Sequence, residues 1–119
     1  MQRTALLTGA TAGFGAAICH TLIENGYRVI GTGRRVARLE QLQQELGENF
    51  HFLAFDISDR QATEDAFHSL PASWQSIDLL VNNAGLALGL ESADKASLDD
   101  WMQMIDTNIK GLVTITRLV

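Results

Sequence analysis

The clearest candidate for a functional motif is formed by the glycines Gly9, Gly13 and Gly15, which follow the apolar run Ala5–Leu7. The segment after Gly15 has a helical pattern, so the glycines form a turn between a strand and a helix. Such a turn can cradle a phosphate group, because backbone without Cβ atoms can approach the anion and the helix start presents N–H groups to it. A tight turn without a ligand is the alternative, but its place after an N-terminal strand favours nucleotide binding.

Two arginines stand about twenty residues beyond the glycine turn, where NAD-binding chains of this kind carry an acidic residue. Here the segment is Gly33-Arg34-Arg35. A guanidinium group binds phosphate with paired hydrogen bonds, whereas a carboxylate would repel the 2′-phosphate of NADP. The alternative is a solvated basic pair at a helix start, which the helix dipole slightly disfavours. We therefore expect NADP, rather than NAD, as the cofactor.

Asp56 and Ile57 follow a predicted third strand, at the edge where sheets of this kind bind their ligands. Two interpretations of this pair stay open. In the first, Asp56 accepts a hydrogen bond from the adenine amino group while Ile57 packs on the ring. In the second, Asp56 only caps the turn into the next helix.

Two adjacent asparagines, Asn82 and Asn83, follow the fourth predicted strand and precede Ala84 and Gly85. Their side-chain amides can bridge neighbouring strand ends, because each supplies donors and an acceptor. The small residues after them leave room for a sugar or a ring. An ordinary turn of the Asn-Gly type is the alternative, but this run is a more specific motif than the glycine turn.

The elements that must position these residues alternate between strand and helix with short connections, as a parallel α/β sheet requires. Apolar runs predict strands over residues 4–8, 27–32, 50–55 and 77–81, with helices over 14–25, through 39–46 and from 58 to before Pro71. Gly26 and Gly47 are placed to end the first two helices. Right-handed crossovers give the sheet order 3-2-1-4, so the fold class is α/β, a doubly wound parallel sheet of Rossmann type.

The predicted sheet is truncated, because a sheet of this kind normally continues past its fourth strand, whereas this sequence stops inside or just after a helix. We therefore expect residues 1–119 to be the N-terminal part of a single NADP-binding Rossmann domain. The fourth strand is expected to form an apolar edge.

Two predicted helix starts carry capping signals, Ser58 with Gln61 and Ser97 with Asp100. The helix that begins at Ser97 is the last and longest. Its expected apolar face consists of Trp101, Ile105, Ile109 and Leu112.

The bulk composition excludes several classes of function. A formal net charge of −5 argues against general affinity for nucleic acid or anionic membranes, and no segment approaches the length of an apolar membrane span. The single cysteine, Cys19, lies among apolar residues, so we expect a core thiol and no internal disulfide. His20, His51 and His68 are scattered over separate elements, so no metal site is expected. The protein is expected to be soluble and cytoplasmic.

The glycine turn Thr8–Gly15 and the run Asn82–Gly85 together resemble the short-chain dehydrogenase/reductase family, and the resemblance covers all 119 residues. More narrowly, the sequence resembles the bacterial NADP-dependent 3-hydroxy acid dehydrogenases, which act on serine and allo-threonine. The segments that match are Gly9–Gly15, Thr32–Arg35, Ile77–Gly89, Lys95–Ser97, Asp100–Trp101 and Met104–Asn108.

The resemblance implies a cofactor contact for each motif. The pyrophosphate and the adenosine ribose would lie against Gly9, Ala10, Thr11, Ala12, Gly13, Phe14 and Gly15. The 2′-phosphate would contact Arg34 and Arg35, and the adenine would contact Asp56 and Ile57. The central sheet beside the cofactor would be stabilised by Asn82, Asn83, Ala84 and Gly85.

Asn108 matches the helix asparagine of the family's catalytic tetrad, whose backbone carbonyl holds a water in the proton relay. On spacing alone, Asn108 would be a surface or helix-packing amide. The family's other catalytic residues, a serine and a Tyr-x-x-x-Lys pair, come after the point where this sequence ends. The one tyrosine is Tyr27, and neither Lys95 nor Lys110 has a tyrosine four residues before it. We therefore expect no dehydrogenase turnover from this chain alone.

The resemblance thus implies the cofactor-binding portion of an NADP-dependent oxidoreductase. The complete enzyme would oxidise 3-hydroxy acids such as serine and allo-threonine, or reduce the corresponding keto compounds. Its partners would be a small hydroxy acid and further copies of itself, because in this family the helix that holds Trp101 to Leu112 lies at a subunit interface. Two alternatives stay open: an NADP-binding half-domain without chemistry, and an inactive fragment that acts through helix–helix association.

Overall fold

The computed structural model describes residues 2–11, 13–85, 88, 92 and 94–119. Within these residues, the centre is a parallel four-stranded sheet in the order β3-β2-β1-β4, which confirms the predicted order. The strands are β1 (Thr4–Leu7), β2 (Arg28–Gly33), β3 (Phe50–Ala54) and β4 (Leu79–Val81). Because every pairing is parallel, the carboxyl ends of the strands meet at one edge of the sheet. At that edge, Leu7 lies between Gly31 and Val81.

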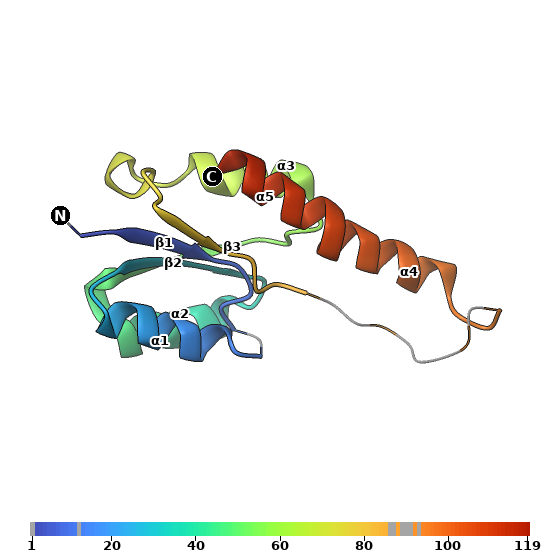
Figure 1. The fold of residues 1–119 in the computed structure, drawn as a ribbon, viewed down its shortest axis with the longest axis horizontal. Helices are drawn as coiled ribbons and strands as arrows, with labels where there is room; N and C mark the ends of the chain where they lie inside the picture. Colours follow the sequence, from blue (N-terminus) through green and yellow to red (C-terminus); the bar gives the residue numbers. More distant parts are fainter. Residues whose placement is uncertain (1, 12, 86–87, 89–91, 93) are drawn as a thin grey trace.

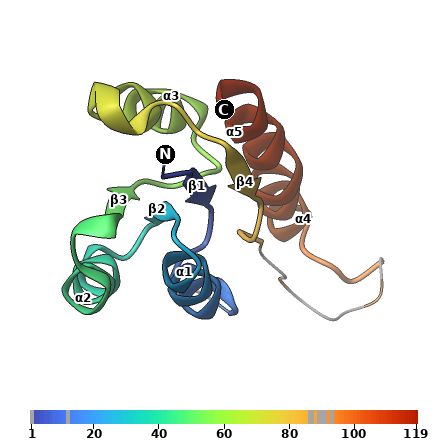
Figure 2. The same cartoon turned by 60° about the vertical axis from the view of Figure 1, so that its left-hand side comes forward.

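Helices cover both faces of the sheet. Figure 2 shows α1 (Gly15–Glu24) and α2 (Val36–Leu46) on one face, and α3 (Arg60–His68) and α5 (Leu112–Leu118) on the other. The last long helix consists of α4 (Leu98–Ile105), η3 (Asp106–Gly111) and α5, and its first part extends beyond the sheet (Figure 1). This is the doubly wound arrangement of a Rossmann-type fold, as predicted.

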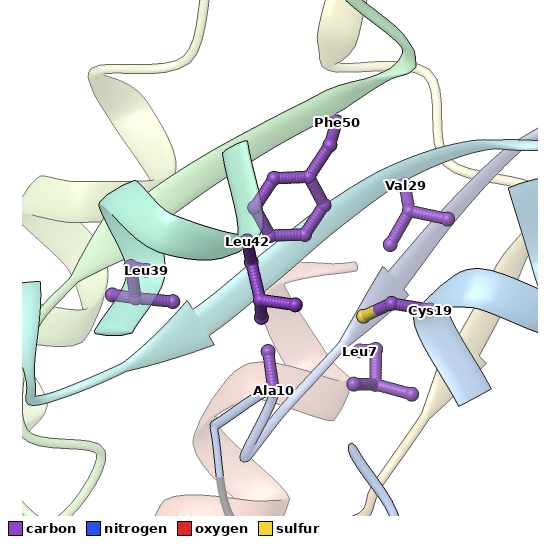
Figure 3. Close-up of a cluster of buried hydrophobic side chains, with 7 residues drawn as sticks. All are labelled: Leu7, Ala10, Cys19, Val29, Leu39, Leu42 and Phe50. Atoms are coloured by element: carbon purple, nitrogen blue, oxygen red, sulfur yellow. The ribbon is translucent and has the colours of Figure 1, made fainter. Parts of the chain in front are cut away.

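The core is divided between the two faces of the sheet. One cluster lies between the sheet and helices α1 and α2 (Figure 3) and consists of Leu7, Ala10, Cys19, Val29, Leu39, Leu42 and Phe50. The other consists of Leu6, Ile30, Leu53, Leu70 and Ile115. Leu6 and Leu7 are neighbours on β1, so they point to opposite faces, and both are fully buried. A parallel strand covered by helices on both sides needs this uninterrupted apolar pattern.

Cys19 is a core residue, as predicted. Its side chain is fully buried in the first cluster, and burial raises the pKa of its thiol to about 11. A neutral thiol packs as a small apolar group. Cys19 therefore supports the attachment of α1 to the sheet.

The helix ends follow the predicted signals with one correction. Gly26 and Gly47 have φ angles of 89° and 76° and follow the ends of α1 and α2, as predicted. The capping box predicted at Ser58 with Gln61 is wrong. Helix α3 begins at Arg60, and the carboxylate of Asp59 accepts the hydrogen bond from the Ala62 N–H at 3.0 Å. A carboxylate is favoured at the positive end of a helix, and the Ser58 hydroxyl is already bonded to Asp56.

The last long helix differs from the prediction in its middle. Ser97 caps α4 as predicted, its hydroxyl accepting from the Asp100 N–H at 3.3 Å. The segment η3, however, is a π-helix, in which backbone hydrogen bonds span five residues instead of four. Apolar residues continue through it at helical spacing, so the sequence pattern does not reveal the change. Such segments are often found at functional sites.

Two classes of feature are absent from the described part of the chain. None of its helices is long and apolar enough to cross a membrane. Its histidine, cysteine, aspartate and glutamate side chains form no group of three or more that could hold a metal ion.

Candidate cofactor-binding site

A cavity of about 180 Å³ opens at the edge of the sheet where the strands end. Its lining comes from the segment after each strand and from the π-helix. The lining residues are Gly9 and Thr11 after β1, Thr32, Gly33, Arg34, Arg35 and Arg38 from the end of β2 onward, Phe55, Asp56 and Ile57 after β3, Ala84 and Gly85 after β4, and Thr107 in η3. Four separate predicted motifs therefore meet at one site, which is the edge where open α/β sheets bind their ligands.

Gly9 lies directly against the Asn82–Gly85 run. Its φ angle is 69°, in the left-handed region that favours glycine, and a Cβ atom here would lie 2.9 Å from the Cα atom of Ala84. No larger side chain fits between these two backbone segments. The glycine is thus required by the contact with Ala84 as well as by the turn.

The rest of the glycine turn divides into residues that line the cavity and residues that do not. Thr11 lines it beside Gly9, whereas Gly13, Phe14 and Gly15 form the turn and the start of α1 outside the lining. The N–H of Ala10 is not available to a ligand, because it donates to the carbonyl oxygen of Thr32 at 2.9 Å. The remaining predicted residue of this motif, Ala12, lies outside the described residues.

The first turn of α1 carries no competing side-chain groups. Phe14 stands at the N-cap and makes no side-chain capping bond, and no acidic residue follows in the first turn. The helix therefore keeps the partial positive charge of its first N–H groups directed at the glycine turn. This arrangement is suited to the binding of an anion such as a pyrophosphate.

The end of β1 and the run after β4 are joined by a buried threonine. The Thr8 hydroxyl accepts hydrogen bonds from the backbone N–H groups of Asn83 and Ala84, at 3.1 and 2.9 Å. In return, the Asn83 side-chain amide donates to the carbonyl of Gly9 at 3.0 Å. Asn83 thus bridges neighbouring strand ends, as predicted. Asn82 does not: its amide donates to the Thr116 hydroxyl of α5 at 3.2 Å.

Arg34, Arg35 and Arg38 are exposed residues that line the cavity. Among the described residues, none of the three forms an ion pair with a carboxylate. Gly33 precedes them, and a Cβ atom there would lie 3.3 Å from the Thr11 hydroxyl. The end of β2 therefore offers cationic donors without the acidic residue that would repel a phosphate.

Of the two interpretations of Asp56, the structure confirms the capping of the turn, and the adenine contact stays a prediction. Asp56 caps the turn before α3, because its Oδ1 atom accepts from the N–H and the hydroxyl of Ser58 at 3.0 and 2.7 Å. It also lines the cavity, next to Ile57. The turn holds the carboxylate at the cavity wall in a fixed position.

The π-helix η3 contacts the site at three places. Thr107 lines the cavity, and the side-chain oxygen of Asn108 lies 3.7 Å from where a Cβ atom of Gly85 would be. Gly111 is buried against Ile57, whose carbonyl oxygen would lie only 2.8 Å from a Cβ atom at position 111. The segment that carries Asn108 is therefore seated against both the wall after β3 and the run after β4.

Comparison with known proteins decides the family. The sequence profile of a family described as short chain dehydrogenase matches residues 3–119. This chain belongs to the short-chain dehydrogenases. The relationship explains why the glycine turn and the Asn82–Gly85 run occur together, and it confirms the resemblance drawn from the sequence.

Three similar proteins among the short-chain dehydrogenases are informative. A probable NADP-dependent dehydrogenase of Haemophilus influenzae is 72% identical over 116 residues, which is 98% of this chain and 46% of the relative. The NADP-dependent 3-hydroxy acid dehydrogenase YdfG of Escherichia coli K12 is 57% identical over 114 residues, 96% of this chain and 46% of the relative. The solved closed form of a serine dehydrogenase complexed with NADP+ is 56% identical, with a TM-score of 0.92 over 96% of this chain and 46% of that one. This chain thus spans about half the length of these short-chain dehydrogenases.

Sequence reasoning missed several residues that line the site of this short-chain dehydrogenase. Thr32, Arg38, Phe55 and Thr107 line the cavity, and Thr8 organises the edge beside it. Arg38 could have been found, because it stands in the first turn of the helix that begins directly after the two predicted arginines. Thr107 could not, because its approach depends on how the last helix packs against residues far away in the sequence.

Proposed function

We propose that this chain is the NADP-binding part of an NADP-dependent short-chain dehydrogenase. The observation that carries the proposal is the cavity at the sheet edge, where Arg34 and Arg35 stand without an acidic residue at the end of β2. A carboxylate in that place would favour NAD and oppose a 2′-phosphate. The names of the relatives from Haemophilus influenzae and Escherichia coli, both NADP-dependent dehydrogenases, support the same cofactor.

In the proposed complex, each wall of the cavity binds one part of the cofactor. The pyrophosphate lies at the glycine turn, between Gly9 and Thr11 in the cavity lining and the start of α1, whose positive end favours an anion. The 2′-phosphate lies against Arg34 and Arg35. Asp56 accepts a hydrogen bond from the adenine amino group while Ile57 packs on the ring. Ala84 and Gly85 border the remaining side, towards Asn108, and Asn82 and Asn83 hold this run against α5 and the glycine turn.

The chemistry that NADP supplies when bound is the transfer of a hydride to or from its nicotinamide ring. This chain's own contribution is binding and orientation. Asn108 is the residue proposed to act near the reacting atoms, its backbone carbonyl holding a water that passes protons. A π-helical pitch changes the backbone hydrogen-bond pattern around Asn108, which suits this role. The family's serine and Tyr-x-x-x-Lys motif complete the reaction and are not matched by residues of this chain.

The proposed substrates of the complete enzyme are 3-hydroxy acids such as serine and allo-threonine. Support comes from YdfG, a 3-hydroxy acid dehydrogenase, and from the serine dehydrogenase, which are 57% and 56% identical to this chain. A hydroxy acid would be oxidised to the keto compound while the cofactor accepts the hydride. The substrate class therefore rests on the relatives, and the cofactor class rests on residues of the cavity.

The first test is a calorimetric titration of the purified 119-residue chain with NADP and, separately, with NAD. We expect binding of NADP that is clearly tighter than binding of NAD. Equal affinity for both cofactors would refute the role given to the arginines, and binding of neither would refute a cofactor-binding function for this chain. A second measurement follows NADPH formation with serine, for which we expect no turnover.

We also propose that the last long helix associates with a second copy of the chain. Several large apolar side chains on this helix are exposed, namely Leu98, Trp101, Met102, Ile105, Ile109, Leu112 and Val113. An exposed apolar face of this kind is typical of an interaction surface. The predicted apolar face of Trp101, Ile105, Ile109 and Leu112 is therefore available for pairing.

A further inference from the structure

Arg38 is a residue of the cavity that neither the motifs nor the proposed function has used. It lies in the first turn of α2, three residues after the N-cap residue Arg35, and it lines the same cavity as Arg34 and Arg35. Residues three and four positions apart share one side of a helix. The segment 34–38 places three arginines in the lining of one cavity of about 180 Å³.

This gathering is electrostatically unfavourable when the cavity holds no anion. Like charges at helical spacing repel one another, and the first turn of a helix disfavours cations. Helix α2 has no acidic residue in its first turn, and Arg38 has no carboxylate partner among the described residues. What distinguishes Arg38 from the other exposed arginines without an ion pair in the described part of the chain, Arg3 and Arg117, is its place in the lining of the cavity beside Arg34 and Arg35. Its charge is therefore open to an anion that enters the cavity.

The charge balance of the cavity identifies that partner. Among the described lining residues, the three arginines are opposed by one carboxylate, that of Asp56, which leaves an excess of two positive charges. A phosphate monoester carries about 1.5 to 2 negative charges at pH 7. With Arg34 and Arg35 alone, the carboxylate of Asp56 would leave one positive charge, too few to neutralise such a group. With Arg38, the excess is two positive charges, which matches the negative charge of the phosphate group.

We propose that Arg38 is a third residue that binds the 2′-phosphate of NADP, and that it sets the preference for NADP over NAD by offsetting Asp56. This inference rests on the proposed cofactor-binding function. The phosphate has three terminal oxygens, and a third guanidinium group can donate to the oxygen that the other two leave to solvent. NAD has a hydroxyl group in that place and gains nothing from Arg38.

The experiment measures dissociation constants of the 119-residue chain for NADP and NAD at one fixed ionic strength. We expect Arg38→Ala to weaken NADP binding by about tenfold or more, the effect of losing a charge-assisted hydrogen bond, and to change NAD binding by less than about twofold. Arg38→Lys keeps the charge without the paired donors, so its affinity for NADP should lie between those of the wild type and Arg38→Ala. Arg60→Ala removes an exposed arginine outside the cavity and should leave both constants unchanged.

Smaller probes separate an effect on the phosphate from an effect on the whole cofactor. We expect Arg38→Ala to weaken binding of 2′-AMP and to leave binding of 5′-AMP unchanged. Equal losses for NADP and NAD, or no loss for NADP, would overturn the inference while the proposed function stands. If the wild-type chain binds neither cofactor, the proposed function fails first and the role of Arg38 fails with it.

Discussion

The side-chain amide of Asn83 donates a hydrogen bond to the backbone carbonyl of Gly9 at 3.0 Å, across 74 residues of sequence. This bond joins the two motifs that resemble the family, and the Thr8 hydroxyl strengthens the junction by accepting from two N–H groups of the same run. The glycine turn is therefore held from the side by the run after β4. Its shape depends on both segments, and so does its ability to receive a ligand.

Replacement of Thr8 by valine should lower the free energy of unfolding by about 1–3 kcal/mol. Valine has a similar shape but no acceptor, so the Ala84 N–H loses the Thr8 hydroxyl in a partly buried place, and the Asn83 N–H keeps only the Val81 carbonyl. Urea denaturation of both proteins measures the difference. Thr114→Val is the matched control, because the Thr114 hydroxyl only donates to a carbonyl of its own helix. Equal stability of Thr8→Val and the wild type would mean that the hydroxyl does not hold the junction.

Replacement of Gly111 by alanine should destabilise the protein, although the same replacement in most helices is stabilising. Alanine in a helix is normally favoured over glycine by roughly 0.5–1 kcal/mol. Here the new Cβ atom would lie 2.8 Å from the carbonyl oxygen of Ile57, so the π-helix must move away from the cavity wall. We expect a net loss of about 1–3 kcal/mol, the usual effect of overpacking.

Thermal unfolding measures the effect of Gly111→Ala, and Gln103→Ala at an exposed position of the same long helix reports the ordinary effect of alanine. A Gly111→Ala variant more stable than the wild type would show that the helix is not seated on Ile57. The same variant should weaken NADP binding, because Thr107 would be displaced with the helix.

The stability of the protein should fall in mildly acidic solution because of His51. Burial lowers the pKa of this histidine from 6.5, and its ring lies against Trp74, which in turn carries the Arg28 guanidinium group at 4.3 Å. The unfolded chain therefore takes up the proton more readily than the folded one. The stabilisation from a neutral His51 is complete above pH 6.5 and is lost as the pH falls below that value.

Urea midpoints at pH 7.5 and pH 5.5 test this dependence. His51→Phe keeps a ring beside Trp74 and cannot titrate, so its midpoint should fall less than that of the wild type over the same interval. His68→Gln, at an exposed position, controls for the loss of a histidine elsewhere. If the urea midpoints of the wild type and His51→Phe fall by the same amount, groups other than His51 cause the acid sensitivity.

Replacement of Ile109 by glutamate should reduce self-association of the chain. The Ile109 side chain is 57% exposed on the last long helix, and a charge there would have to be desolvated in a helix pair. Sedimentation velocity at several concentrations measures the distribution of species. Gln103→Glu adds the same charge at an exposed polar position and serves as the control. If the wild-type chain is monomeric at every concentration, the proposed association is wrong.

Much of the fold followed from local sequence. The strand order came from the alternation of apolar runs and helices, and the helix stops at Gly26 and Gly47 came from the freedom of glycine to adopt positive φ angles. The assembly of the glycine turn, the arginines and the Asn82–Gly85 run around one cavity followed from parallel topology alone. These are features for which local preference and global fold agree.

The features that could not be predicted depend on competition between hydrogen-bonding groups and on contacts between residues far apart in the sequence. Ser58 and Asp59 both can cap a helix, and the choice of Asp59 was decided by the bond between Ser58 and Asp56. The resemblance implies a cofactor contact for Ala10, but the N–H of this residue already donates to the carbonyl oxygen of Thr32. The π-helix could not be predicted from the spacing of apolar residues, because it changes the backbone hydrogen bonds and not that spacing. Its contacts with Ile57 and Gly85 join segments far apart in the sequence.

The position of β1 in the sheet also bears on how the chain folds. Its pairing with β2 needs only the short connection through α1, whereas its pairing with β4 must wait for a partner far along the chain, as the 74-residue separation of Thr4 and Asp78 shows. Closure of so long a loop is slow, since ordering entropy is lost before the contacts form. During synthesis, β1, β2 and β3 can assemble in the order in which they are made. One side of β1, the strand that leads into the glycine turn, stays without its neighbour until the ribosome has reached the asparagines.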